Sequence, residues 1–369
     1  MTLIHVLLLF YAFTYISWTL SLIIILKLNS KSHQGLPLPA SLPFISILVA
    51  AKNEEHNILR CLRSLAALDY PQHLFEVLIA DDGSTDATSN VVENFMVSHQ
   101  NFKLIKVTSK LGKADAKANA LAHVIKEAKG EYYFITDADI KVRPLWVKSL
   151  LSYHQQPIGI VSSSTAIEGK SLFAKLQNVE WVYTFGLIYV ASRLRIPVTA
   201  VGNNMMISRE AYHSTGGYEN FNFSITEDYE LFMQTLKKGW GFDNVINPQG
   251  IAYSLPIKTF KQLMHQRKRW MHGAAQVPKS LGLFLGMQVL YLPIVLYCFA
   301  VAPLLSLIFI NFKMGFQYFF ICNVFKKANL PKPSITLYVL YDIYASCMAI
   351  LTIVVYLLPS KVEWKGKRY

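Results

Sequence analysis

The chain contains no charged side chain between Leu3 and Leu26. A helix needs roughly 20 consecutive apolar residues to cross a bilayer core, so this run is long enough to do so. A cleaved signal peptide would have a basic start, a shorter apolar core and a small-residue cleavage site, and none is evident. The run therefore predicts a retained membrane anchor. Lys27 and Lys31 follow it, which places the next part of the chain on the cytoplasmic side.

Two more apolar runs lie near the C-terminus. Leu281–Ile310 is uncharged, although we expect Pro293 and Pro303 to kink it, and Ile335–Leu358 carries one acid, Asp342. The stretch Met314–Phe325 between them is too short to span, so we expect it to lie in the interface or against the bundle. The tail, residues 359–369, is basic and should be cytoplasmic. Three spans satisfy these placements.

The formal net charge of +13 is compatible with a nucleic acid or an anionic membrane as partner. The lysines and arginines are not gathered on one predicted helix or tail, and many of them flank the apolar runs. The chain is also 53% hydrophobic and only 16% charged, with the apolar excess at its two ends. This distribution favours membrane lipids as a partner and argues against nucleic acid.

The middle of the chain has a different pattern, which begins after the proline-rich segment LPLPASLP. Short, continuously apolar runs alternate there with segments of helical spacing. Such strands are typical of a parallel sheet covered on both faces, so the predicted fold class is doubly wound α/β with a mostly parallel sheet. Strands are predicted at Phe44–Ala51, Phe75–Ala80, Phe102–Val107 and Tyr132–Thr136, and helices at Glu54–Ala67, Thr85–Ser98 and Ala114–Ala128.

Polar clusters follow each of these four strands: AKNEE, ADDGSTD, SKLGK and TDADIKVRP. Any one of them could be an ordinary turn with a helix cap. Ligands of open α/β sheets bind at the carboxyl ends of the strands, however, so four successive clusters indicate a binding site.

The acids Asp137 and Asp139 come at the end of a buried strand, where two carboxylates are costly unless they are paired or bind a cation. Mg²⁺ or Mn²⁺ takes one or two carboxylates together with substrate phosphate oxygens. The pair therefore predicts a metal site for a nucleotide diphosphate. Either Asp81 or Asp82 could accept hydrogen bonds from a base or ribose. Lys113 and Lys117 could face the phosphates, or both could be solvated helix lysines, which is what we expect for Lys117.

Asp228 lies in SITEDYELFMQTLKKG, where Thr226 could cap a helix whose first turn holds Glu227 and Asp228. Acids there can simply compensate the helix dipole. Alternatively, Asp228 is a general base. A carboxyl at a helix N-terminus tends toward a low pKa, which would make it a weak base unless the acceptor is held close and desolvated.

A basic cluster lies in KQLMHQRKRWMHG, just before the second apolar run. It could bind nucleic acid, anchor the chain at a membrane, or clamp a phosphorylated substrate. The segment Thr259–Gln276 also has the pattern of an amphipathic helix on a membrane surface. A planar arginine guanidinium suits a diphosphate, and we expect the neighbouring basic side chains Arg267 and Lys268 to meet lipid headgroups or solvent.

The motifs ISILVAAKNEE, IADDGSTD, TDAD, ITEDYEL and QRKRW occur here in the order found in membrane-integrated family 2 glycosyltransferases, which the chain resembles from Phe44 to Trp270. These include cellulose and hyaluronan synthases, ceramide glucosyltransferase and bacterial relatives. The resemblance implies a GT-A type fold, a UDP-linked sugar as donor, and inversion at the transferred sugar. It also implies roles: Glu54, Asp81, Asp82 and Lys113 at the donor; Asp137 and Asp139 at the metal; Asp228 as base; Gln266 and Arg269 at the departing diphosphate; Glu227 and Trp270 at the acceptor.

We therefore predict a membrane-bound, metal-dependent enzyme that adds one sugar to a membrane lipid or lipid-linked glycan, with its catalytic domain on the cytoplasmic side of a bacterial inner membrane. A processive polysaccharide synthase, a non-catalytic scaffold and a lipid phosphotransferase are the alternatives. The predicted divisions are an anchor (1–27), a linker (28–43), the glycosyltransferase domain (44–255), an interfacial helix (256–280), a C-terminal transmembrane region (281–358) and the basic tail (359–369).

Overall fold

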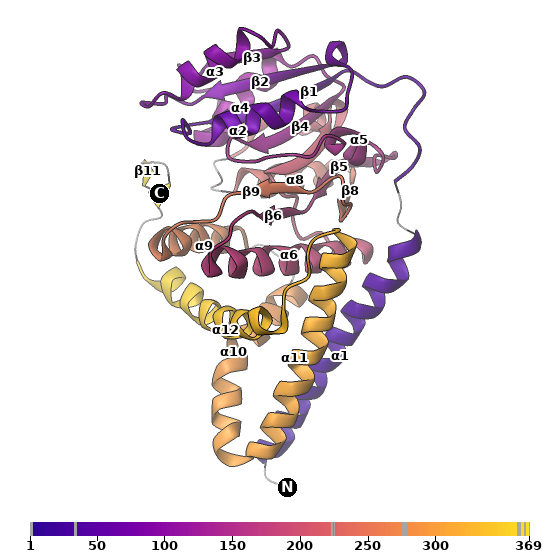
Figure 1. Ribbon diagram of the computed structural model, residues 1–369, viewed down its shortest axis with the longest axis vertical. Coiled ribbons are helices and arrows are strands. Elements are labelled where there is room, and N and C mark those ends of the chain that lie inside the picture. The colour runs from indigo at the N-terminus through magenta and orange to yellow at the C-terminus, as the bar shows by residue number, and fades with distance from the viewer. Residues whose placement is uncertain are drawn as a thin grey trace.

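The computed structural model describes residues 3–32, 35–222, 224, 226–274, 279–359, 363–364 and 367–368. An α/β domain forms one end of the molecule, and long apolar helices extend from it to the other end, where the N-terminus lies (Figure 1).

The α/β domain is built on a seven-stranded sheet with the strand order β3-β2-β1-β4-β7-β5-β8. Neighbouring strands are parallel except at β7, which is antiparallel to both β4 and β5. The predicted doubly wound, mostly parallel fold is therefore confirmed. The strands are β1 (Ile45–Ala51), β2 (Phe75–Asp81), β3 (Phe102–Lys106), β4 (Tyr132–Asp137), β5 (Ile158–Ser163), β7 (Asn204–Ser208) and β8 (Gly241–Val245).

Burial on both faces explains the continuous apolar runs. In β1, Ile47 and Val49 pack into one core and Leu48 packs into the core on the opposite face. Each face needs its own apolar residues, so no polar alternation remains. The predicted strands and helices of this half are confirmed with shifts of a few residues at their ends. The helices are α2 (Ile58–Ala66), α3 (Thr88–Met96) and α4 (Ala116–Glu127), with the 3-10 turn η1 (Gln72–Leu74).

The second half of the domain adds elements for which the sequence gave no explicit prediction. A short parallel pair, β6 and β9, lies outside the main sheet. The long helix α6 packs on β6 and also contacts the apolar helices (Figure 1). The elements are α5 (Trp146–Leu151), β6 (Thr165–Ile167), α6 (Leu172–Arg193), α7 (Arg209–Ser214), η2 (Tyr218–Asn220), α8 (Glu227–Lys237) and β9 (Ala252–Ser254).

The remaining helices are α1 (Leu3–Ser32), α9 (Phe260–Ala274), α10 (Lys279–Val301), α11 (Pro303–Lys327) and α12 (Ile335–Leu357), and β10 (Glu363–Trp364) pairs with β11 (Lys367–Arg368) near the C-terminus. Among the described residues, three helices are long and apolar enough to cross a membrane: Leu9–Lys27, Pro303–Lys327 and Ile335–Leu357.

The predicted span Leu281–Ile310 is wrong. The chain turns at Ala302, so α10 ends at Val301 and α11 begins with Pro303. Proline is favourable in the first turn of a helix, where its missing N–H is not needed. The stretch Met314–Phe325 is the second half of α11, so its prediction as a segment too short to span is wrong as well. Most of the predicted basic tail lies outside the described residues.

The acid predicted inside the last apolar run has a partner. Lys313 of α11 donates to Asp342 of α12, and its ammonium group lies 4.2 Å from the ring centre of Tyr291 on α10. Lys313 is only 2% exposed. Charges in an apolar bundle are tolerated when they pair with each other, so this contact fixes three helices to one another.

Candidate active site

The four polar clusters predicted from the sequence meet along one edge of the sheet. β3, β2, β1 and β4 are neighbours, and all run in the same direction. In their register Asp81 pairs with Ala51, and Asp137 pairs with Ala50. The carboxyl ends therefore lie level with one another, which gathers the acids that follow them.

The two acids of the DDGSTD motif have different surroundings. Asp81 is 5% exposed, and its carboxylate accepts from the backbone N–H of Ser84 at 2.8 Å and from the Ser89 hydroxyl. These bonds hold the loop and the start of α3. Asp82 is more accessible, with Lys52 at 3.5 Å from its carboxylate. Of the two, Asp82 has the carboxylate with more capacity left for a ligand.

Glu54 lies on the loop after β1, beside this cluster. Its backbone N–H donates to Thr88 at 2.7 Å, and its carboxylate accepts from the Asn57 amide at 2.8 Å. Lys113 lies on the loop after β3, where its ammonium donates to Asn222 at 3.2 Å. Glu54 and Lys113, which are predicted to bind the nucleotide sugar, thus lie on loops at the same edge of the sheet.

Lys117 occupies the centre of the acids, so its prediction as a solvated helix lysine is wrong. Its ammonium lies 2.6 Å from the Asp137 carboxylate and 2.9 Å from that of Glu227. Burial alone lowers the pKa of Lys117, but the carboxylates of Asp137, Glu227 and Asp228 outweigh it and raise that pKa well above its usual value. A permanent positive charge therefore links the end of β4 to the start of α8.

Asp228 is positioned by two backbone groups. The N–H of Gly202 donates to its carboxylate at 2.9 Å, and its own helix supplies the N–H of Tyr229 at 2.8 Å. A Cβ atom on Gly202 would lie 2.6 Å from the Asp228 Cβ, so only glycine permits this approach. Thr226 precedes the helix but makes no side-chain cap bond.

The pKa of Asp228 is raised, whereas its position at a helix N-terminus predicts a lowered pKa. Burial, and then the neighbouring Glu227 carboxylate, raise the pKa of Asp228 to about 6, although Lys117 and the two backbone N–H groups lower it in part. A carboxyl with this pKa is mostly ionised at neutral pH yet binds a proton far more readily than an exposed one. It therefore suits general base catalysis.

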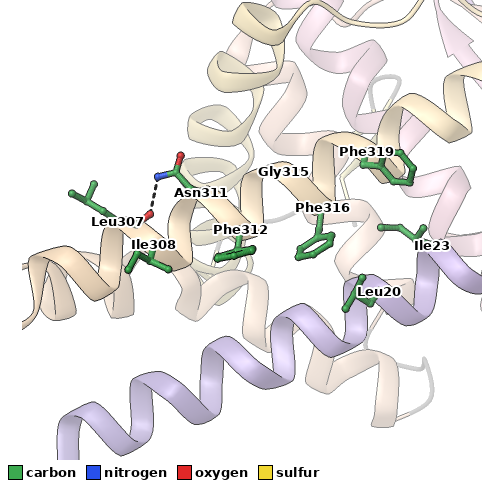
Figure 2. Close-up of a pocket in the computed structure, with 9 residues that line it drawn as sticks. All are labelled: Leu20, Ile23, Leu307, Ile308, Asn311, Phe312, Gly315, Phe316 and Phe319. Atoms are coloured by element: carbon green, nitrogen blue, oxygen red, sulfur yellow. Dashed lines mark hydrogen bonds between the residues drawn. The ribbon is translucent and has the colours of Figure 1, made fainter.

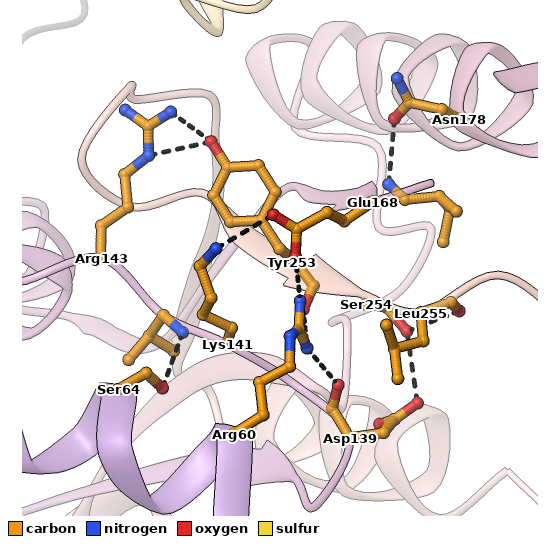
Figure 3. A network of polar contacts seen from close by, with 12 residues as sticks. Arg60, Ser64, Asp139, Lys141, Arg143, Glu168, Asn178, Tyr253, Ser254 and Leu255 are labelled. Atoms are coloured by element: carbon orange, nitrogen blue, oxygen red, sulfur yellow. Dashed lines mark hydrogen bonds and ion pairs between the residues drawn. The ribbon is translucent and has the colours of Figure 1, made fainter. Parts of the chain in front are cut away.

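Asp139 is held by a polar network around Arg60 of α2 (Figure 3). The Arg60 guanidinium donates to the backbone carbonyl of Asp139 at 2.8 Å, to that of Tyr253 at 3.2 Å and to the Glu168 carboxylate at 2.6 Å. The Ser254 hydroxyl lies 3.3 Å from the Asp139 carboxylate. Arg60 thus holds the loop that carries Asp139 against β9 and against Glu168, which directly follows β6.

The acids fit a divalent ion only together with a substrate. No group of three or more His, Cys, Asp or Glu side chains that could hold a metal occurs among the described residues. Asp137 already binds Lys117, which leaves Asp139 as the principal carboxylate for a cation. Mg²⁺ and Mn²⁺ are commonly bound by one or two carboxylates plus phosphate oxygens, and this donor set matches that arrangement.

The basic helix α9 packs differently from the prediction. Arg267 is 6% exposed and binds Glu180 of α6 at 2.6 Å, and Lys268 is 4% exposed and donates to the backbone carbonyl of Leu358 at 2.7 Å. The expectation that these two side chains meet lipid headgroups or solvent is wrong. They join α9 to α6 and α12 because each satisfies a polar group on those helices.

The three residues of the QxxRW pattern share this helix. Gln266 accepts from Arg267 at 3.3 Å. Trp270 is 36% exposed, with Trp181 of α6 edge-on at 5.5 Å and the Arg267 guanidinium over its ring at 4.4 Å. α9 follows β9, whose Ser254 contacts Asp139, and Figure 1 shows it beside α6 below the sheet. Arg269 lies one residue before Trp270 on this helix, and its approach to the acids stays a prediction.

Several residues of this region have no distinctive sequence signal. Lys117 looks like a helix lysine, Gly202 like a turn glycine, and Arg60 like an exposed position of an amphipathic helix. Tyr218 is 1% exposed, its hydroxyl has no hydrogen-bond partner among the described residues, and burial, with Glu227, Asp228 and Asp137 nearby, raises its pKa. Only the three-dimensional arrangement identifies them.

Comparison with known proteins identifies a family and similar sequences. The profile of glycosyl transferase family 21 matches residues 2–369. A beta-monoglucosyldiacylglycerol synthase from Nostoc sp. is 28% identical over 247 residues, which cover 66% of this chain and 52% of that protein. A poly-beta-1,6-N-acetyl-D-glucosamine synthase from Staphylococcus epidermidis is 27% identical over 63% of this chain and 55% of its own length. The chain thus spans about half the length of these curated relatives.

Among solved structures, a mannosyltransferase from Pyrobaculum calidifontis in complex with GDP-Man and Mn²⁺ superposes with a TM-score of 0.56. The match covers 95% of this chain and 99% of the other, at 16% identity. This likeness confirms the GT-A type of fold.

Proposed function

The chain belongs to glycosyl transferase family 21, and from that premise we propose that it is a membrane-bound inverting enzyme that moves a sugar from a nucleotide diphosphate to a membrane lipid. The order of its motifs predicts glycosyltransferase family 2. The matching family is family 21 instead, and it is also a family of glycosyltransferases. The glucosyldiacylglycerol synthases among its relatives act in lipid glycosylation by their names, which supports a lipid acceptor.

The observation that carries the proposal is the Asp228 carboxyl, with its pKa raised to about 6 and its position fixed by the Gly202 N–H. In the proposed reaction, Asp228 takes the proton of an acceptor hydroxyl as the oxygen attacks the anomeric carbon. The nucleoside diphosphate leaves from the opposite side, so the configuration inverts. Asp228 must face the acceptor, and Glu227 and Trp270 are assigned to the acceptor beside it.

The donor is proposed to lie along the sheet edge. Glu54 and Asp82 contact the nucleoside, Asp81 holds their loop, and Lys113 reaches the phosphates. Asp139 and Asp137 are the residues that would hold Mg²⁺ or Mn²⁺, and an ion bound there would neutralise part of the diphosphate charge. Gln266 and Arg269 of α9 are proposed to stabilise the leaving diphosphate, since a fixed cation gains most where charge develops. A UDP-sugar is the proposed donor.

The protein is proposed to be anchored in a bacterial inner membrane with the α/β domain on the cytoplasmic side. The charges next to the apolar runs support this orientation, because Lys27 and Lys31 follow the first of them.

A test uses membranes that contain the protein, a panel of radiolabelled nucleotide sugars, and Mn²⁺ or Mg²⁺. The label should enter the organic phase, and Asp228→Asn should lower this transfer by about 10²–10⁴-fold because a positioned base contributes that much. Glu230→Gln is the matched control, since Glu230 lies on the same helix but binds Gln234 at 2.7 Å. No nucleotide release with any donor would favour a scaffold, and phosphate on the product would favour a phosphotransferase.

A polysaccharide synthase is the second candidate, because a poly-N-acetylglucosamine synthase is among the relatives. Such an enzyme adds many sugars to one chain and needs a path for the polymer across the membrane. Label found only in long, water-soluble polymer would select this activity over single addition to a lipid.

A further inference from the structure

The last long helix, α12, follows the helices of the α/β domain along most of its length. The Tyr341 ring lies 6.4 Å from that of Tyr183 on α6, and the Tyr344 hydroxyl donates to Glu180 on α6 at 3.1 Å. About three turns after Tyr344, Tyr356 meets His272 of α9 at 5.3 Å between ring centres. Successive turns of α12 thus touch α6 and then α9.

The direction of α12 differs from that of the other apolar helices. In Figure 1, α1 and α11 extend side by side along the long axis of the molecule, whereas α12 crosses this direction beneath α6 and α9. The first half of α12 is fixed to α11 by the Lys313–Asp342 pair. Its end is fixed to α9 where Lys268 donates to the carbonyl of Leu358.

The depth of α12 follows from its contact with α9. Arg267, Lys268 and Arg269 are consecutive on α9, and a helix with such a run does not lie in the middle of a bilayer. The C-terminal half of α12 packs directly on α9, where Met348 clusters with Leu263 and Met264. Both ends of α12 are therefore at the level of the α/β domain's lower helices.

The opposite face of α12 is apolar and uncovered. Ile343 is 59% exposed, Leu351 38% and Val354 48%, and these positions recur at helical spacing on one side of the helix. The helices α1 and α11 also expose apolar side chains. A groove of about 700 Å³ between them is lined by Leu20, Phe312, Phe316 and other apolar side chains (Figure 2). Exposed apolar surface of this kind is matched by acyl chains.

We propose that α12 does not cross the membrane but lies in its interface on the side of the α/β domain, with its exposed face against lipid acyl chains. The spanning helices are then α1, α10 and α11, and residues 359–369 stay on the side of the α/β domain. Length and hydropathy alone classify α12 as a candidate span because they carry no information on direction. Together with α6 and α9 it forms a lipid-facing floor beside Trp270. This inference does not depend on the proposed reaction.

The test measures membrane depth with spin labels in nanodiscs that contain the whole chain. The four native cysteines are first replaced by serine. Single labels are then placed by Val339→Cys, Ile343→Cys, Leu351→Cys and Val354→Cys, and the ratio of oxygen to nickel-chelate collision rates reports depth. A helix in the interface should give nearly the same ratio at all four positions.

Exposed positions of α11 provide the matched control: Leu304→Cys, Ile308→Cys, Phe312→Cys and Phe319→Cys. Their ratios should vary across the bilayer. A variation along α12 of less than half the variation along α11 supports the proposal, and a larger one overturns it. A C-terminal peptide tag on the otherwise unaltered chain gives a second measurement. In sealed vesicles the tag should be accessible from the side of the α/β domain, and accessibility from the opposite side overturns the proposal.

Discussion

At the scale of single residues, opposing charges meet at the end of β4 and the start of α8. Lys117 neutralises Asp137 and Glu227 through contacts of 2.6 and 2.9 Å, and it partly offsets the effect of burial on Asp228. The pKa of Asp228 is thus the result of burial and Glu227 raising it against Lys117 and two backbone N–H groups lowering it. Changing one neighbour at a time should move that pKa in a direction known in advance.

The pH dependence of kcat/KM tests this balance, because it reports the essential base of the free enzyme. Activity of the unaltered protein should fall as the pH drops through about 6, where Asp228 takes up a proton. Glu227→Gln removes a negative neighbour, so the midpoint should move to lower pH. Lys117→Met removes a positive neighbour, so the midpoint should move to higher pH. Glu230→Gln should leave it in place, and shifts of the same sign in both variants would contradict the assigned environment.

Gly202 provides a second test at this scale. In Gly202→Ala the added Cβ would meet the Asp228 Cβ at 2.6 Å and its carboxylate oxygen at 2.7 Å, so the carboxyl must move. A displacement of about 1 Å can cost about 10² in rate, which is the loss expected in kcat. Gly286→Ala is the control, because nothing lies within 4 Å of a Cβ built there. Full activity of Gly202→Ala would show that the position of Asp228 is not critical.

The sequence could predict the acids of the site because strand ends in a parallel sheet have a known functional bias. It could not predict Lys117, because a lysine in a helix is usually solvated and only the fold brings α4 against α8. The low pKa expected for Asp228 was derived from the helix terminus alone. Burial and Glu227 reverse that expectation. Glu227 is the preceding residue, but the burial of Asp228 comes from the tertiary fold and is not visible in the local sequence.

At the scale of elements, α9 has two kinds of basic residue. Arg267 and Lys268 are buried against α6 and α12 and hold the helix in place. Arg269 is proposed to bind the leaving diphosphate. Substituting Arg267 or Lys268 should lower the free energy of unfolding, and substituting Arg269 should lower kcat.

Arg267→Gln removes one partner of a largely buried ion pair with Glu180, which should cost about 3 kcal/mol of unfolding free energy. Its thermal unfolding midpoint in detergent should fall, and the double variant Arg267→Met with Glu180→Met should recover part of the loss. Arg269→Gln should lower kcat by about 10²-fold and lower the midpoint less than Arg267→Gln does. The reverse pattern, with Arg269→Gln unstable and Arg267→Gln slow but stable, would contradict these assignments.

Elements of the first half of the domain were predictable because each strand is a continuous apolar run between helical segments. Between α10 and α11, Pro303 predicted a kink but not the end of one helix and the start of another, because both sides of Ala302 are equally apolar and hydropathy does not register a reversal of direction. The burial of Lys313 was not predictable either, because its partner Asp342 lies on another helix, 29 residues further along the chain.

At the scale of the whole molecule, the sheet of the α/β domain is followed by α6 and α9, and α12 lies beneath these two helices (Figure 1). β9 leads directly from the contact between Ser254 and Asp139 into α9. In the proposed function, this short connection would place the binding site of a water-soluble donor next to that of an acceptor from the membrane. The general architecture was predictable from the two apolar ends and the α/β pattern between them, whereas the direction of α12 required coordinates.

The most direct measurement is a structure of the protein in nanodiscs with UDP and Mn²⁺. We expect one ion between the Asp139 carboxylate and the diphosphate, with the Arg269 guanidinium within about 3 Å of a diphosphate oxygen. Asp228 should remain free of the nucleotide, on the side from which an acceptor can approach. A nucleotide bound away from the edge formed by β1, β2 and β4, or an Arg269 side chain that points away from the diphosphate, would contradict the proposed active site.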